Sequence, residues 1–185
     1  MCIRDSDDSI HLPVGDVILP WAHDHGVRFL AFSPLARGLL GSQLDPARTF
    51  PPDDERHFLP RFQPDVFPHW ARLSIRLESW ANDHGHTLPQ LAVAWTLASG
   101  GVTSTLIGAK SVAQVEALVG SDEWQLTESQ LAEIDELLAT LPAEAAGALS
   151  IVWDHFPPEA VRAMRDRRHD LANDHPPTST GDDQP

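Results

Sequence analysis

Two short apolar runs stand out in a chain whose other apolar residues follow helical spacing. The runs cover residues 27–33 (VRFLAFS) and 102–108 (VTSTLIG), and runs of this length and composition are typical of buried parallel strands. Apolar residues three and four positions apart on either side of the runs predict amphipathic helices. Strands that alternate with helices indicate parallel βα units, so the sequence predicts an α/β fold.

Glycines and capping residues mark where the predicted helices begin and end. One helix is expected between Val14 and Gly26, with Pro20 predicting a kink or a later start. Another has Leu73 and Leu77 on its apolar face and ends at Gly85. Three capping-box patterns, in which Ser or Thr precedes Gln by three residues, predict further helix starts. They begin at Thr87, Ser111 and Thr127.

Two segments between these elements carry more specific expectations. The helix after Ser111 has one apolar side that we expect to be buried, formed by Val112, Val115, Leu118 and Val119. Residues 35–68 are rich in Pro, Gly, Asp and Arg, which predicts a long functional or mobile loop. Its carboxylates at 53–55 are expected to be solvated. Aromatic residues in and just after this segment either line a substrate pocket or anchor the loop: Phe50, Phe58, Phe62, Phe67 and Trp70.

Two parallel strands cannot form a closed sheet, and the helices that accompany them cannot cover both of its faces. We therefore expect the fold to lack its first part. Residues 1–13 are interpreted as a leader that is partly non-native, residues 14–141 as the folded unit, and residues 142–185 as a C-terminal extension with a disordered acidic tail.

Charge and composition narrow the class of protein. The net charge of −14 and the pI of about 4.9 argue against nucleic acid as a partner, because no basic stripe is present to displace counterions from phosphates. No run approaches the length of a membrane span, the start of the chain is not a secretory signal, and Cys2 is the single cysteine. A cytoplasmic protein is expected.

One motif and its companions resemble a known family. Residues 32–40 (FSPLARGLL) follow the first strand, where backbone amides and a hydroxyl can face a ligand. Together with Gly26-Val27, Asp54-x-Arg56, 60–62 (PRF), 90–95 (QLAVAW) and 106–110 (LIGAK) with Gln114, this motif is similar in order and spacing to the C-terminal half of aldo-keto reductases. The resemblance implies the C-terminal portion of a (β/α)8 TIM-type barrel, with the two runs as strands seven and eight.

The resemblance also implies an NADPH site and assigns the first loop to it. Phe32 takes the position where the family usually stacks Tyr on the nicotinamide ring, and a Phe ring keeps that stacking face. Ser33, Leu35, Arg37 and Gly38 correspond to the loop along the pyrophosphate, where N–H groups, a hydroxyl and a guanidinium suit an anion.

The second loop corresponds to the adenosine end of the cofactor. Gly108, Ala109, Lys110 and Gln114 match the loop and helix start that hold it in the family. A helix N-terminus favours anions, and Lys110 adds the charge that a 2′-phosphate needs, so NADPH is preferred over NADH. Many relatives have Glu-Asn where this chain has Ala117-Leu118, which departs from the family pattern at the adenine.

The residues that perform the family's chemistry are missing from this sequence. Aldo-keto reductases transfer a hydride to a carbonyl carbon while a Tyr, assisted by Lys, Asp and His, protonates the oxygen. The chain has no Tyr, and its single Lys, Lys110, is assigned to the cofactor. We predict that a longer parent reduces a small-molecule aldehyde or ketone, or runs the reverse reaction, while the chain as given supplies cofactor-binding loops and is inactive.

Other interpretations stay open at this point. A non-catalytic NADPH-binding regulatory or auxiliary subunit of the same fold would also lack the Tyr, and an independent helical interaction protein would make the strand motifs accidental. The pairs His23-x-His25 and His84-x-His86 lie at predicted helix ends beside Gly, which favours helix capping over metal binding. The substrate and the oligomeric state are not readable from the sequence.

Overall fold

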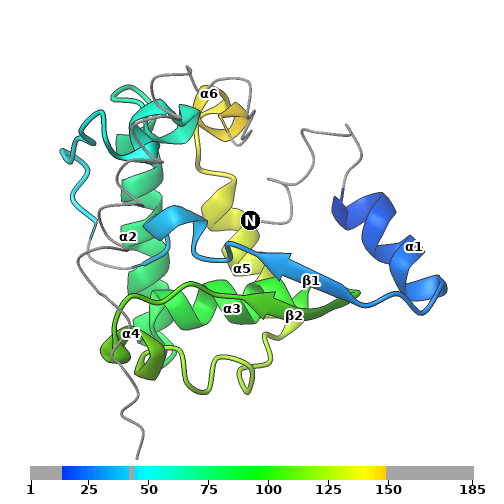
Figure 1. Ribbon diagram of the computed structural model, residues 1–185. Coiled ribbons are helices and arrows are strands. Elements are labelled where there is room, and N and C mark those ends of the chain that lie inside the picture. The colour runs from blue at the N-terminus through cyan, green and yellow to red at the C-terminus, as the bar shows by residue number, and fades with distance from the viewer. Residues whose placement is uncertain (1–13, 42–43, 149–185) are drawn as a thin grey trace, which may run out of the picture.

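The computed structural model describes residues 14–41 and 44–148, and its centre is a pair of parallel strands backed by helices (Figure 1). Strand β1 spans Phe29–Phe32 and strand β2 spans Val102–Leu106. They pair in parallel with Leu30 opposite Ser104 and Phe32 opposite Leu106, and the register is irregular between Phe29 and Leu30. The predicted parallel α/β organisation is confirmed, although each strand is shorter than its apolar run.

The first helix forms where the sequence predicts it. A π-helical turn at Val14–Ile18 leads into α1, Leu19–Asp24, so the α-helix starts late and Pro20 occupies its first turn, where its missing N–H costs nothing. Leu19 is 1% exposed and packs with Phe29 and Val102 at the start of the strands. A Cβ on Gly101 would lie 3.0 Å from the Leu19 carbonyl oxygen, and this close approach explains a glycine there.

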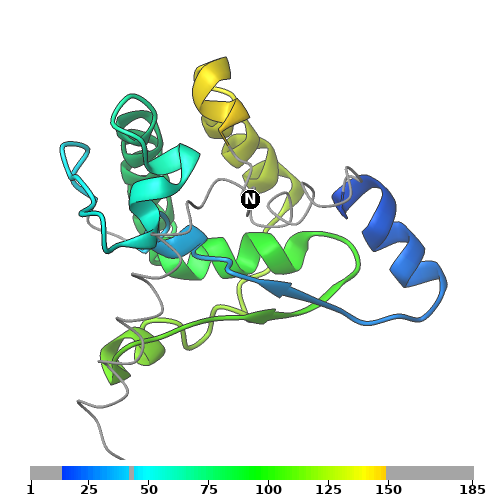
Figure 2. The same ribbon diagram turned by 45° about the horizontal axis from the view of Figure 1, so that its top comes forward.

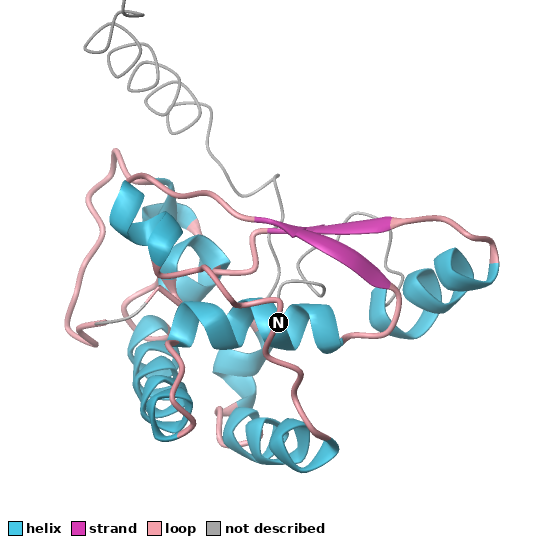
Figure 3. Cartoon of the chain, turned by 90° about the horizontal axis from the view of Figure 1, so that it is seen from below, coloured by secondary structure: helices cyan, strands magenta, loops and turns pink. Residues whose placement is uncertain are grey.

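Helix α3 lies along one face of the strand pair, and α2 and α5 lie beyond it (Figures 1 and 2). These helices span Leu88–Ala98, Phe67–Asp83 and Glu128–Leu138. The capping boxes predicted at Thr87 and Thr127 are both formed, with each threonine accepting from the N–H of the Gln three residues on. Viewed from below, the two strands lie to one side of these helices (Figure 3).

The main core lies among α2, α3 and α5, and the long loop contributes to it. The loop holds three 3-10 turns: η3 at Ala36–Gly38, η4 at Glu55–Phe58 and η5 at Pro60–Phe62. Four of the five aromatic residues singled out in the sequence, two in the loop and two at the start of α2, are at most 7% exposed, so they pack into the core and anchor the loop. They are Phe50, Phe62, Phe67 and Trp70. The predicted loop ends earlier than expected, because α2 begins at Phe67.

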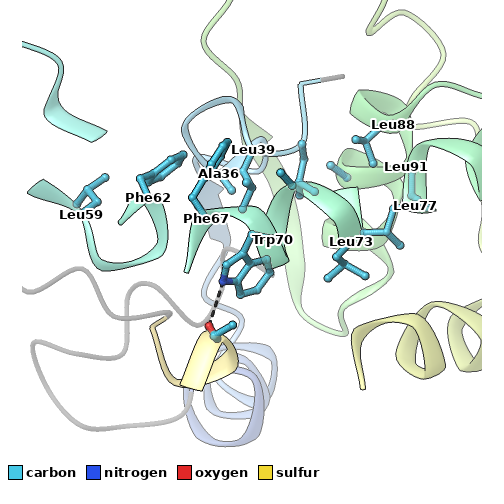
Figure 4. Close-up of a cluster of buried hydrophobic side chains, with 14 of the residues drawn as sticks. Ala36, Leu39, Leu59, Phe62, Phe67, Trp70, Leu73, Leu77, Leu88 and Leu91 are labelled. Carbon is cyan, nitrogen blue, oxygen red and sulfur yellow. Dashed lines mark hydrogen bonds between the residues drawn. The ribbon is translucent and has the colours of Figure 1, made fainter. Parts of the chain in front are cut away.

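A short helix after Pro142 joins this core. Helix α6 spans Ala143–Gly147, and Ala145 is 2% exposed. The indole N–H of Trp70 donates to the Ala145 carbonyl over 3.0 Å in a buried position (Figure 4). The first turn beyond the expected boundary at residue 142 therefore packs on α2. The expected leader at 1–13 and the tail after 148 lie outside the described residues, and the three domain boundaries stay predictions.

One predicted helix face is wrong. Helix α4 spans Val112–Glu116, and the side expected to be buried is open to solvent, with Val112 74%, Val115 55% and Val119 70% exposed. The helix has five residues and ends at Glu116, so Leu118 and Val119 lie beyond it, and none of its residues is buried. Its capping box is also half formed, because Ser111 accepts from the Gln114 N–H while the Gln114 side chain bonds to another amide.

The described helices also bear on a membrane location. Among residues 14–41 and 44–148, none of the helices combines the length and the apolar character that crossing a bilayer requires.

Candidate functional site

The strand pair brings the two predicted cofactor segments to the same edge of the structure. Because β1 and β2 are parallel and Phe32 lies opposite Leu106, both strands end at the same level. Ser33 to Gly38 follow β1, and Gly108 to Lys110 follow β2. Residues separated by about 70 positions in the sequence thus begin their loops side by side, which is where parallel α/β folds bind ligands.

Phe32 presents an apolar surface beside that edge. Side chains alternate along a strand, so Ala31 points toward the helices and is 4% exposed, while Leu30 and Phe32 point to the other face. Leu30, Phe32 and Leu106 are 54%, 50% and 54% exposed, and Phe32 lies opposite Leu106 on the neighbouring strand. The Phe32 ring is therefore accessible to a planar ligand, as the stacking prediction requires.

The loop after β1 has an unusual backbone. Ser33, Ala36 and Arg37 all have positive φ, at 55°, 47° and 57°, and none of them is glycine. Left-handed residues other than glycine cost on the order of 1–2 kcal/mol each, and they persist where the surrounding structure fixes them. The Ala36 N–H donates to the Ser33 carbonyl, the Gly38 N–H donates to the Leu35 carbonyl, and Ala36 is buried. Strain held in this way is concentrated at functional sites.

Arg37 carries a cation into this loop. Its side chain is 21% exposed, and one terminal nitrogen forms an ion pair with a carboxylate oxygen of Glu55, which is 40% exposed. The Nε of Arg37 is buried and has no hydrogen-bond partner among the described residues. A guanidinium has five N–H donors, so Arg37 has donors to spare for an anionic ligand.

A second arginine positions the segment that holds Glu55. Arg56 donates two hydrogen bonds to Asp54 from Nε, at 2.9 and 3.2 Å, and one from Nη2 at 2.6 Å. Its guanidinium lies 4.6 Å from the centre of the Phe50 ring, and Asp54 also caps η4 by accepting from the Arg56 N–H. The expectation that residues 53–55 are merely solvated is wrong for Asp54 and Glu55, which face arginines.

Glu55 is a site residue that the sequence interpretation missed. The available signal was that the loop holds opposite charges in two segments. Arg37 lies in the first segment, and the second reads Asp54-Glu55-Arg56. Opposite charges in two segments of one loop predict pairing only when the loop folds back on itself. That fold-back depends on Phe50 and Phe62 packing into the core, which no local pattern reveals.

The loop after β2 is open and less elaborate. Gly108, Ala109 and Lys110 are exposed, and the Lys110 ammonium has no ion-pair partner among the described residues. The Lys110 N–H donates to the Gln114 side-chain oxygen over 2.6 Å, so Gln114 closes the turn. Because α4 has only five residues, its dipole is short, and Lys110 is the main positive charge at this loop.

One histidine of each pair caps its helix as predicted. The Nδ1 of His25 lies 2.8 Å from the Trp21 carbonyl oxygen, and the Nδ1 of His84 lies 2.7 Å from the Trp80 carbonyl oxygen. Each ring also packs on the indole four residues earlier, with interplanar angles of 19° and 32°. In the part of the chain that the structure describes, no three His, Cys, Asp or Glu side chains gather as a metal site would require.

Comparison with known proteins identifies what the chain is similar to. The model of the aldo/keto reductase family matches residues 16–139. An aldo-keto reductase from Strobilurus tenacellus is 34% identical over 120 residues, which are 65% of this chain and 36% of that protein. An aldo-keto reductase from Bacillus subtilis is 30% identical over 131 residues, covering 70% of this chain and 40% of that protein.

The similarity extends to three dimensions. The solved structure of a glycerol dehydrogenase from Gluconobacter oxydans superposes with a TM-score of 0.64 at 33% identity, over 69% of this chain and 39% of that one. The chain thus spans about two fifths of the length of the relatives it matches. Its strands and helices have the fold of these proteins, which is a (β/α)8 barrel. The match of the family model over most of the chain, with the agreement in structure, shows that this chain belongs to the aldo-keto reductase family.

Proposed function

We propose that this chain forms the NADP(H)-binding part of a longer aldo-keto reductase that reduces a small-molecule aldehyde or ketone to an alcohol, or runs the reverse reaction. Membership of the family implies nicotinamide-dependent carbonyl chemistry. Strands β1 and β2 would be strands seven and eight of the barrel, whose following loops often bind phosphate. The observation that carries the proposal is that the parallel pair ends with Phe32 beside Leu106, so both cofactor segments start together.

The residues present fit such a cofactor. The exposed Phe32 ring offers a stacking face for a nicotinamide, and the spare donors of Arg37 suit a pyrophosphate. Lys110 stands exposed at the second loop, where a 2′-phosphate would distinguish NADPH from NADH. A relative from Schizosaccharomyces pombe, 29% identical over 143 residues, has NADP(+) in its name, in agreement with this preference. When bound, the cofactor supplies the hydride.

Catalytic groups must come from elsewhere. Without any Tyr, and with Lys110 assigned to the cofactor, the chain cannot protonate the substrate oxygen in the family's manner. We therefore expect the chain by itself to be inactive, with the proton donor in the rest of the parent. The parent is proposed to be cytoplasmic and to act on small carbonyl compounds, with neither nucleic acid nor membrane as partner.

The absence of Tyr favours one second candidate. A regulatory or auxiliary subunit of this fold would bind NADPH as a structural or sensing ligand and would need no proton donor. The upstream coding sequence separates the two: in-frame strands that carry Asp, Tyr, Lys and His support the enzyme, and an upstream frame without them supports the auxiliary subunit.

Cofactor titration of the 185-residue chain tests the site. We expect NADPH to quench tryptophan fluorescence at lower concentration than NADH does. Replacement of Lys110 by Ala should weaken NADPH binding by about ten- to a hundredfold and leave NADH nearly unchanged, since a hydrogen bond to a charged group contributes on the order of 1.5–3 kcal/mol.

A matched variant controls for charge. Arg28→Ala removes the same charge from an exposed position outside both loops and should leave both affinities unchanged. Equal affinity for NADPH and NADH, or an equal loss of both in Lys110→Ala, would show that Lys110 does not read the 2′-phosphate. Failure of either dinucleotide to bind would contradict the proposal for this chain.

A further inference from the structure

Arg37 and Glu55 form an ion pair in which Arg37 could readily exchange Glu55 for another anion. Arg37 lies in the strained loop after β1, with φ at 57°, and its guanidinium is mostly buried. Glu55 comes from the first residue of η4 and is about twice as exposed as Arg37, at 40% against 21%. Partly exposed pairs of this kind add little stability, so Glu55 can give up its partner at small cost.

The neighbouring pair is held more firmly. Asp54 and Arg56 share three side-chain hydrogen bonds, are 17% and 23% exposed, and are packed beside the Phe50 ring. The guanidinium of Arg56 also lies against the loop, because a Cβ on Gly38 would meet its Nη1 at 3.7 Å. The Asp54–Arg56 pair therefore fixes η4 against Arg37 and Gly38. Glu55, between Asp54 and Arg56 in the sequence, is more exposed than either of them.

The charges of this cluster cancel one another. Two arginines, Arg37 and Arg56, face two carboxylates, Asp54 and Glu55. An approaching phosphate would find no net attraction while both pairs are closed. A guanidinium binds phosphate with two parallel hydrogen bonds, which a single contact to one carboxylate oxygen does not match, and the buried Nε of Arg37 has no partner.

From these contacts we infer that Glu55 is a positioning residue that holds Arg37 in the ligand-free site and competes with the phosphate groups of a nucleoside diphosphate for it. On binding, Arg37 exchanges Glu55 for phosphate oxygens, while Asp54 keeps Arg56 in place. Glu55 thereby lowers the affinity of the site and keeps the guanidinium where the ligand arrives. The inference rests on the proposed function for the identity of the ligand.

Phenylglyoxal labelling of the 185-residue chain tests the exchange, with modification at Arg37 and at Arg56 followed separately by peptide mass spectrometry. Glu55→Gln should raise the labelling rate of Arg37 about two- to fivefold, the factor that corresponds to a partly exposed ion pair. Arg56 should react as in the unmodified chain. Glu136→Gln removes an equal charge from an exposed position on α5 and should change neither rate.

Protection by ligands completes the test, with inorganic pyrophosphate and NADPH as separate probes. Pyrophosphate should protect Arg37 at about two- to fivefold lower concentration in Glu55→Gln than in the unmodified chain. Equal labelling and equal protection in the two proteins would overturn the inference, as would faster labelling of Arg56 together with Arg37, which indicates general loosening. Protection by pyrophosphate but not by NADPH would support the exchange and contradict the proposed cofactor.

Discussion

Two segments of this chain have nearly the same sequence and the same backbone, but they lie in different surroundings. Residues 21–26 read WAHDHG and residues 80–85 read WANDHG. Each ends a helix with a left-handed glycine, φ 65° at Gly26 and 78° at Gly85. In each, the N–H after the glycine bonds to the carbonyl of the alanine, at 2.8 and 2.9 Å, which is the Schellman pattern.

The difference lies in what surrounds the tryptophans. Trp21 is 55% exposed and stacks on His25 with ring centres 4.3 Å apart. The Trp80 ring lies 4.0 Å from the His84 ring and 6.0 Å from the Trp124 ring, measured between centres. It also packs on the main core and donates from Nε1 to Glu133 over 2.8 Å. The comparison shows that six residues determine how a helix ends, while distant elements determine which end is buried.

Truncation of the tryptophans should separate the two segments most strongly. Trp80→Ala removes packing against the core and the bond to Glu133, so we expect a loss of about 2–3 kcal/mol in the free energy of unfolding. Trp21→Ala, at its exposed position, should cost less than about 0.5 kcal/mol. Urea denaturation of the two variants measures both, and equal losses would show that surroundings do not set the difference.

The glycines should behave alike. Gly26→Ala and Gly85→Ala each place a Cβ on a left-handed residue, with no other heavy atom within 4 Å, so the cost is conformational and about 1 kcal/mol in both. Asn tolerates this conformation better, and the matched Asn variants should lose about half as much. A clearly larger loss at Gly85 than at Gly26 would mean that tertiary packing constrains that turn.

A smaller and again equal effect is expected from the histidines. His25→Ala and His84→Ala each remove a side-chain contact to the tryptophan carbonyl, of 2.8 and 2.7 Å, at exposed helix ends. The expected loss is about 0.5 kcal/mol for each. Thermal denaturation of the two variants under identical conditions decides this, and a loss confined to one of them would break the equivalence.

The smallest effect should come from the one position that differs. His23 and Asn82 are both exposed, so exchange of the two residue types should change the free energy of unfolding by less than about 0.5 kcal/mol. Urea denaturation of the His23→Asn, Asn82→His double variant checks this. A larger change would show that the third residue contributes to the cap.

The same division between local and distant causes explains which parts of the fold were predictable. The capping boxes at Thr87 and Thr127 and the two strands follow from short patterns, and all of them form. The apolar side of α4 has helical spacing too, but Val112 is 74% exposed, because burial needs a covering element that spacing cannot supply. The pattern predicted the helix correctly but wrongly predicted that its apolar side is buried.

The candidate site divides in the same way. The motif around Phe32 and Arg37 could be recognised because its residues are contiguous, and the parallel pairing that brings Lys110 to the same edge follows from the α/β organisation. Glu55 could not be found, since its partner lies 18 positions away and meets it only through the fold of the long loop.

The left-handed backbone at Ser33, Ala36 and Arg37 also limits which sequences can serve this loop. Valine, isoleucine and threonine carry a branched Cβ that this conformation excludes, whereas glycine, asparagine and aspartate adopt it readily. A saturation-mutagenesis library of this chain should therefore tolerate glycine at position 36 and reject branched residues, and the burial of Ala36 should disfavour larger polar side chains there as well. Selection at such a position acts on the shape of the main chain, and a neighbour of the binding residues can be as constrained as the residues that bind.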